Sequence, residues 1–265
     1  MFPQTKNLRS EDLQEVNEYL STKKQNIFMN QTVNLASVRN EISMRMKYKS
    51  ENQKKFAKSI DSSQISVCYG LAGGGKTFVS VMKAIKMFQE GKIDKIYLIK
   101  SVTTLQGEEI GFLKGDLKEK IRPFAYSFMH AFKKIVGEST LRKMEHIGVI
   151  EFLPIAFLRG VSLEPNSIVL VDEAQNISIT SLRTILTRIE EGCKLVILGD
   201  TRQVDMRNGK NKSSLQYFID NFNSFDAKDI SFIEFTREDQ VRNPLILKLE
   251  DKFEELEKQD PSKFK

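Results

Sequence analysis

The eight residues from Gly70 to Thr77 read GLAGGGKT and match the pattern G-x-x-x-x-G-K-[ST] at every position. An apolar, β-branched run at 64–69 precedes them, and a segment of helical character at 78–85 follows. A glycine-rich turn between a strand and a helix lets backbone N–H groups approach a phosphate chain at the positive end of the helix. The stretch therefore predicts a phosphate-binding loop in an α/β fold. The alternative is a glycine-rich turn that happens to contain Lys-Thr.

Such a loop implies ATP and Mg²⁺ as ligands. Backbone amides would hold the phosphates, the Lys76 ammonium would reach the β- and γ-phosphates, and the Thr77 hydroxyl would ligate Mg²⁺. The predicted nucleotide-contacting residues of the loop are Gly70, Leu71, Ala72, Gly73, Gly74, Gly75, Lys76 and Thr77.

Two further apolar runs end in polar residues. The run 167–171 is followed by Asp172 and Glu173, and the run 194–198 is followed by the sequence GDTRQ, which ends at Gln203. Asp172 would supply the second protein ligand of Mg²⁺, and Glu173 would act as general base or orient the attacking water. One acidic pair after a strand is commonly a solvated turn. Three strands that each end in the expected polar group indicate one nucleotide site at the carboxyl edge of a parallel sheet.

With these motifs the chain resembles the PhoH-like ATPases, whose core is similar to that of superfamily 1 helicases. Besides GLAGGGKT, the resemblance rests on GEEIGFLKGDLKEKIRPF (107–124), LVDEAQN (170–176), LTRI (186–189), GDTRQVD (199–205) and VRNPL (241–245). The combination of GEEIGFLKGDL with DEAQN separates this family from other P-loop proteins. The chain departs from the family in one place, because Ser101-Val102 follows Lys100 where members usually carry Arg-Pro. Any phosphate or RNA contact of that arginine would have to be made by Lys100.

The resemblance also implies roles for single residues. Gln53 resembles the glutamine that reads the edge of adenine in helicase-type ATPases; the alternative is a solvent-exposed glutamine in a basic helix. Gln203 resembles the glutamine that senses the γ-phosphate. Arg242 resembles the late arginine that touches the γ-phosphate, or is an ordinary residue at the start of a helix. Arg159 is a second candidate cation, and Arg188 could equally make a structural ion pair on a helix.

Composition places the chain among globular proteins. It has 265 residues, 40% of them hydrophobic and 29% charged, enough for one large α/β domain with extensions. No apolar stretch approaches 18 residues and the N-terminus MFPQTK has no apolar region, so we expect neither a membrane span nor a signal peptide. Cys68 and Cys193 adjoin predicted core strands, which favours small buried residues in a reducing cytoplasm over a disulfide or zinc site. The isolated His130 and His146 are not expected to bind metal.

Alternating strands and helices predict a mostly parallel, helix-covered, RecA-like sheet of the P-loop NTPase class. Between the second strand and the Asp172 strand we expect helices near 117–136 and 139–146 and a strand at 149–152. The predicted organisation is an N-terminal helical extension over 1–50, the ATPase core over 51–245, and a C-terminal amphipathic helix over 246–265. The apolar face of that last helix begins just before it and comprises Leu245, Leu249, Phe253 and Leu256.

The net charge is +6, and basic residues cluster at 45–58, 114–143 and 202–212. Such clusters favour salt-dependent binding of nucleic-acid phosphates without sequence readout. Aromatic residues interleave with the second cluster and could stack on unpaired bases, or could instead form the core face of a helix. They are Phe124, Tyr126, Phe128 and Phe132.

The whole pattern predicts a Mg²⁺-dependent ATPase that acts on single-stranded nucleic acid, RNA in preference to DNA. Because a helicase of superfamily 1 has two such cores and this chain has one, movement along a strand would require a homo-oligomer, and a ring is compatible with the resemblance. One alternative is a slow nucleotide-dependent switch that docks another protein through its N-terminal helix. The other is a small-molecule kinase, which the order Asp172-Glu173-Ala174-Gln175 disfavours because it suits water activation.

Overall fold

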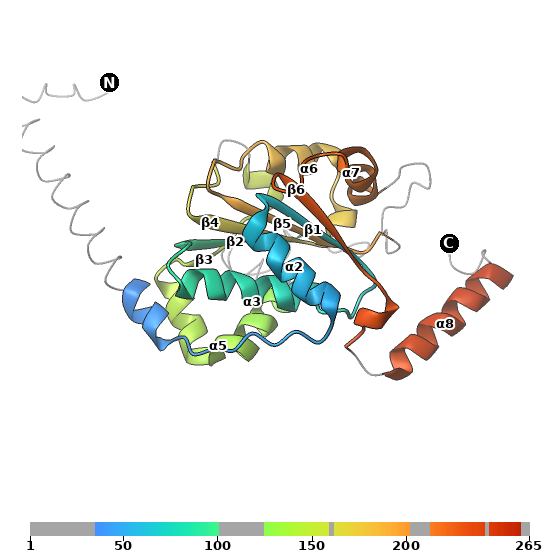
Figure 1. Ribbon diagram of the computed structural model, residues 1–265, viewed down its shortest axis with the longest axis horizontal. Coiled ribbons are helices and arrows are strands. Elements are labelled where there is room, and N and C mark those ends of the chain that lie inside the picture. Colours follow the sequence, from blue (N-terminus) through green and yellow to red (C-terminus); the bar gives the residue numbers. More distant parts are fainter. Residues whose placement is uncertain (1–34, 101–124, 159–161, 202–212, 242–243, 261–265) are drawn as a thin grey trace, which may run out of the picture.

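Six parallel strands form the centre of the molecule (Figure 1), in the order β3-β2-β4-β5-β1-β6. This computed structural model describes residues 35–100, 125–158, 162–201, 213–241 and 244–260. The strands are β1 (Ile65–Gly70), β2 (Lys95–Lys100), β3 (Ile150–Phe152), β4 (Ser167–Asp172), β5 (Lys194–Gly199) and β6 (Ile230–Phe235). The sequence did not single out β6. The predicted α/β class with a parallel, helix-covered sheet is confirmed.

Helices cover both faces of the sheet (Figure 1). One face packs against α2 (Glu51–Ser62), α3 (Lys76–Gln89) and α5 (Tyr126–His146), and the other against α6 (Ile179–Leu186) and α7 (Ser214–Phe222). Successive β2 residues alternate between the two cores, with Ile96 in the first and Tyr97 in the second. Strands that are buried on both faces have continuous apolar sequences, which is why β4 could be predicted from the sequence. The last helix, α8 (Pro244–Gln259), extends away from the sheet.

The loop between β1 and α3 requires glycine for two reasons. Gly73 and Gly75 have φ angles of 91° and 85°, in the left-handed region that glycine adopts without strain. Gly70 lies so close to β6 that a β-carbon there would overlap the carbonyl oxygen of Phe235. The glycines of the motif are therefore required by the backbone conformation of the loop, in addition to letting a ligand approach it.

The segment between β2 and β4 contains a break that the sequence predicted. Residue Gly137 has φ 79° and ψ 165°, so α5 consists of two helical parts separated by a kink. This agrees with the predicted helices that end near 136 and begin near 139, and β3 agrees with the predicted strand. The part of the first predicted helix that precedes residue 125 lies outside the described residues.

The described part of the N-terminal segment packs against the core. Residues 35–41 are helical, and Val38 and Ile42 are buried in the same core as α3. The Arg39 guanidinium donates to the carboxylate of Asp94, at 2.5 Å, and to the carbonyl of Ile93. The helix expected near residues 10–20 lies outside the described residues, and the domain boundaries at 50 and 245 stay predictions.

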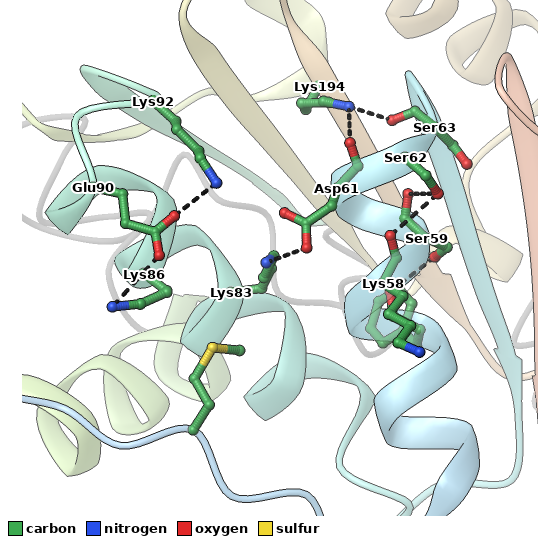
Figure 2. A network of polar contacts seen from close by, with 12 residues as sticks. Lys58, Ser59, Asp61, Ser62, Ser63, Lys83, Lys86, Glu90, Lys92 and Lys194 are labelled. Atoms are coloured by element: carbon green, nitrogen blue, oxygen red, sulfur yellow. Dashed lines mark hydrogen bonds and ion pairs between the residues drawn. The ribbon is translucent and has the colours of Figure 1, made fainter.

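A polar network fixes the carboxyl end of α2 at the amino ends of the strands (Figure 2). The Lys194 ammonium donates to the carbonyl oxygens of Asp61 and Ser63 at 3.0 and 2.7 Å. The buried Lys83 of α3 donates to the Asp61 carboxylate at 2.5 Å. The network joins α2 to β5 and α3, so the opposite end of α2 is held beside the loop.

Two of the expectations drawn from composition can be compared with the fold. Cys68 and Cys193 are both free and buried, as predicted. Among the helices of the described ranges, none combines the length and the apolar character that a membrane crossing needs.

Candidate functional site

A cavity of about 610 Å³ opens at the carboxyl edge of the sheet, above the first turn of α3. It brings together predicted residues from the loop, from α2 and from the end of β4. Those that line it are Gln53, Ala72, Gly73, Gly75, Lys76, Thr77, Asp172 and Glu173. Gly70, Leu71 and Gly74 complete the loop without lining the cavity, and Gln203, Arg242 and Arg159 lie outside the described residues.

The Lys76 side chain folds back over its own loop. Its ammonium donates to the carbonyl oxygens of Gly70 and Leu71, at 2.7 and 2.8 Å. Burial lowers the pKa of Lys76, and the surrounding carboxylates, among them Asp172 and Asp200, act in the opposite direction. The Lys76 ammonium therefore lies at the cavity and is hydrogen-bonded to two neutral carbonyl oxygens. A phosphate oxygen, which is charged, could replace them.

Four contacts from other segments brace the loop. The Ala72 amide donates to the Asp200 carboxylate at 3.1 Å, and the Ala72 carbonyl accepts from the Gln240 side chain. The Val241 amide donates to the carbonyl of Gly73, and the Gln53 side chain donates to that of Gly74. The Ala72 contact shows that a loop N–H already binds an anionic oxygen. Asp200 stood next to the predicted site, but no sequence pattern indicated this contact.

Thr77 and Asp172 lie face to face across the cavity floor. The Thr77 hydroxyl is 3.3 and 3.5 Å from the two carboxylate oxygens of Asp172, which is 6% exposed. Burial raises the pKa of Asp172, and the nearby Lys100 ammonium opposes that shift. Lys100 also donates to the hydroxyl of Ser127, which in turn donates to Asp172. Lys100 therefore stands beside Asp172, and Ser127 is a contact that the sequence analysis missed.

These two residues fit the magnesium site predicted for them. A hydroxyl and a carboxylate are hard oxygen ligands, and they come from the two elements that the motifs identified. Mg²⁺ is characteristically held by one or two protein oxygens together with phosphate oxygens and water. The donor set is thus suited to Mg²⁺ bound with a polyphosphate.

Glu173 is held by a residue that sequence reasoning overlooked. Its backbone adopts the left-handed conformation, φ 56° and ψ 41°, which is uncommon for a non-glycine residue and turns the chain sharply after β4. The buried Gln175 donates to the Glu173 carboxylate at 2.7 Å and accepts from the Asp200 amide at 3.1 Å. A β-carbon at Gly199 would lie 2.6 Å from the same Gln175 oxygen. The DEAQN motif contained this glutamine, but its hydrogen-bond partners depend on how β4 and β5 lie side by side in the sheet.

Gln53 is buried, which excludes the solvent-exposed alternative. It is 4% exposed because the N-terminus of α2 packs against the loop. Its amide nitrogen donates to the Gly74 carbonyl and its amide oxygen accepts from the Lys49 backbone, both at 2.8 Å. The amide thus fixes the loop, and an additional contact with adenine stays a prediction.

The aromatic residues of α5 divide between core and surface. Phe128 and Phe132 are fully buried, so the prediction that they stack on unpaired bases is wrong and the core-face alternative is right. Tyr126 is 70% exposed and lines the cavity, whereas Phe124 lies outside the described residues. Arg188 lies just after α6, and its Nε atom is buried without a hydrogen-bond partner within the described residues.

The chain is similar to known proteins over most of its length. It is 34% identical to a PhoH-like protein of Bacillus subtilis over 204 residues, and 32% identical to one of Synechocystis over 213 residues. These matches cover 77% and 80% of the chain and 62% and 63% of the relatives, so the chain spans about three fifths of their length. The large terminase of a thermophilic bacteriophage superposes on 77% of the chain, which covers 50% of that protein, with a TM-score of 0.45 and 12% identity.

The family model described as PhoH-like protein matches residues 45–254, from the segment before α2 into α8. The match includes the loop, the Asp172 strand and every described residue of the cavity. This chain belongs to the PhoH-like protein family.

Proposed function

We propose that this chain is a Mg²⁺-dependent ATPase. The observation that carries the proposal is the approach of the Thr77 hydroxyl to the buried Asp172 carboxylate, 3.3 Å, with Glu173 directly after it in the same cavity. A phosphate loop, a metal-ligand pair and a candidate base are the three parts that nucleotide hydrolysis needs together.

In this proposal each residue of the site has a distinct role. The loop amides and Lys76 bind the β- and γ-phosphates, and Thr77 and Asp172 hold Mg²⁺. When bound, the ion neutralises charge on the phosphate oxygens. Glu173 accepts the proton of the attacking water, and Gln175 fixes the direction in which its carboxylate points. The family resemblance adds Gln203 as γ-phosphate sensor and an arginine, Arg242 or Arg159, that neutralises charge in the transition state.

The direct test measures phosphate release from ATP by the full chain, with and without Mg²⁺, single-stranded RNA and single-stranded DNA. We expect turnover that requires Mg²⁺ and rises with RNA more than with DNA. Mass measurement of the same samples tests assembly into a homo-oligomer. A protein that binds ATP and Mg²⁺ but releases no phosphate under any of these conditions would contradict the ATPase proposal.

The Gln175 contact gives a prediction about positioning. Gln175→Met keeps the length of the side chain but removes its hydrogen bonds to the Glu173 carboxylate and from the Asp200 amide. We expect kcat to fall about tenfold or more while the Kd for ATP changes less than about threefold. Single-turnover kinetics and equilibrium binding separate the two quantities. Gln216→Met on α7, where Gln216 donates to Asp220 on the surface, is the matched control. Equal losses of kcat and ATP affinity would contradict a positioning role.

Single-stranded RNA is the proposed partner, and described basic residues support it. The cluster at 45–58 lies on the surface of the segment before α2 and of α2 itself. All six of its basic side chains are exposed: Arg45, Lys47, Lys49, Lys54, Lys55 and Lys58. A surface of this charge binds phosphates through counterion release and without sequence preference.

Neutralising three of these side chains should weaken RNA binding evenly across sequences. In the triple variant Arg45→Gln, Lys55→Gln, Lys58→Gln, the log–log slope of affinity against salt should flatten by about 0.7 for each lost phosphate contact. Fluorescence anisotropy with two unrelated oligonucleotides measures both effects. Because the side chains are exposed, the melting temperature should stay close to that of the parent. An unchanged slope would remove this cluster from the interface.

One observation favours the alternative, a nucleotide-dependent switch that binds another protein. The helix α8 exposes large apolar side chains, namely Leu245, Leu249, Phe253 and Leu256. Exposed apolar side chains on one helix suit contact with another chain. The two functions differ in the turnover assay, because a switch would hydrolyse ATP slowly and show no response to RNA.

A further inference from the structure

The cavity that contains the phosphate loop also has a lining of different chemistry. Besides the loop and the carboxylates of β4 and β5, aromatic and basic residues from α3, from α5 and from the segment before α2 border it. They are Lys47, Lys49, Phe78, Tyr126, His130 and Lys134. Three are lysines and three carry aromatic rings.

Two of these aromatic rings are stacked on each other. Tyr126 and His130 lie one helical turn apart on α5, with ring centroids 5.8 Å apart and an angle of 17° between the ring planes. Tyr126 is 70% exposed, whereas Phe128 and Phe132 of the same helix are fully buried. The first turn of α5 is fixed relative to the catalytic groups, because Ser127 donates a hydrogen bond to Asp172.

We propose that the stacked pair Tyr126–His130 is the platform for the nucleobase of the bound nucleotide, a purine. This rests on the proposed function. The platform and the phosphate loop border one continuous cavity, whose volume of about 610 Å³ lies within the range of small-ligand sites. An exposed aromatic surface offers a purine its largest contact, and stacking on an aromatic side chain changes affinity by roughly 5- to 150-fold per base.

The same lining predicts weak discrimination between adenine and guanine. Guanine presents an N2 amino donor that adenine lacks, and its selective recognition requires an acceptor placed opposite that group. The described residues that line this part of the cavity include no carboxylate; the carboxylates of the lining are Asp172, Glu173 and Asp200 at the ends of β4 and β5. Stacking alone therefore accepts both bases, and a preference for ATP over GTP of more than about tenfold would require the predicted contact of Gln53 with adenine.

Calorimetric titrations of the full chain with Mg²⁺ test the platform. The ligands are a non-hydrolysable ATP analogue and inorganic tripolyphosphate, which has the same phosphates and no base. We expect Tyr126→Ala to weaken binding of the analogue at least about fivefold and to leave tripolyphosphate binding unchanged, while Tyr126→Phe retains the parent affinities. Tyr217→Ala on α7, which removes another exposed tyrosine, is the matched control and should change neither affinity.

Three results would overturn the platform. The first is equal weakening of the analogue and of tripolyphosphate by Tyr126→Ala, which would assign the loss to the phosphate site. The second is unchanged binding of the analogue together with weaker binding of a single-stranded oligonucleotide, which would assign the pair to nucleic acid. The third is equal affinity of the parent for both ligands. A parent that binds neither ligand would instead refute the proposed function, and the platform with it.

Discussion

Replacement of Glu173 by glutamine should leave a protein that binds ATP and hardly hydrolyses it. The glutamine keeps the shape of the side chain but cannot accept the proton of the attacking water, so we expect kcat to fall about 10²-fold or more. The Kd for ATP should change less than about threefold, because the carboxylate is not required by the loop that binds the phosphates. Rapid-quench measurement of a single turnover, together with equilibrium binding, gives both numbers.

The matched control for this variant is Glu191→Gln, which removes one exposed carboxylate from the turn before β5. It changes net charge equally and should hydrolyse ATP at the parent rate. Parental turnover by Glu173→Gln would show that another group activates the water. Because Gln175 donates to the Glu173 carboxylate, the kcat of the double variant with Gln175→Met should not fall further than that of Glu173→Gln alone.

Replacement of Lys76 by methionine should impair binding and turnover together. The ammonium contacts phosphate both in the ground state and in the transition state, so its loss should weaken ATP binding about tenfold or more and lower kcat about 10²-fold or more. Stability should not fall, since methionine occupies the partly buried site without the desolvation of a charge. Calorimetric binding and thermal unfolding test these two expectations.

Lys86→Met is the control for Lys76→Met, because Lys86 lies on the same helix and pairs with Glu90 away from the cavity. That variant should bind and hydrolyse ATP as the parent does. Parental affinity for ATP in Lys76→Met would remove the lysine from the phosphate site. A large loss of stability would show that the bonds from Lys76 to the Gly70 and Leu71 carbonyls matter more to the fold than to a ligand.

The sequence predicted those strands and helices whose pattern of apolar residues reflects how they are buried in the fold. The Asp172 strand is buried on both faces and therefore reads as a continuous apolar run, and the loop motif fixes its own strand and helix. Strand β6 (Ile230–Phe235) was missed because only its two end residues are buried and its four inner residues do not alternate between buried and exposed positions. Its place beside β1 depends on pairing between residues distant in sequence, as in the register of Val67 with Phe232.

The residues of the candidate site likewise divide into those that the sequence predicted and those that it did not. Residues that belong to a motif of known chemistry, such as Thr77 and Asp172, could be predicted from the sequence. The structure places these two side chains in contact. Gln175 could not be predicted in this way, since its two bonds depend on how closely β5 passes Glu173. The buried state of Gln53 likewise depends on how α2 packs against the loop. Spacing along the chain reveals ligands of a shared substrate, but not the contacts that orient them.

The strand order has a consequence for which ligands the site can tell apart. Because β5 lies between β1 and β4, the ends of the loop strand and of the Asp172 strand are two strand spacings apart, about 9–10 Å. Thr77, at the start of α3, bridges that width, because its hydroxyl lies 3.3 Å from the Asp172 carboxylate. In the proposed reaction the last phosphate therefore lies toward β4, where Glu173 follows Asp172. A ligand shorter by one phosphate occupies the loop without presenting a phosphate to Glu173, so substrate and product differ at the end of the polyphosphate that points toward β4.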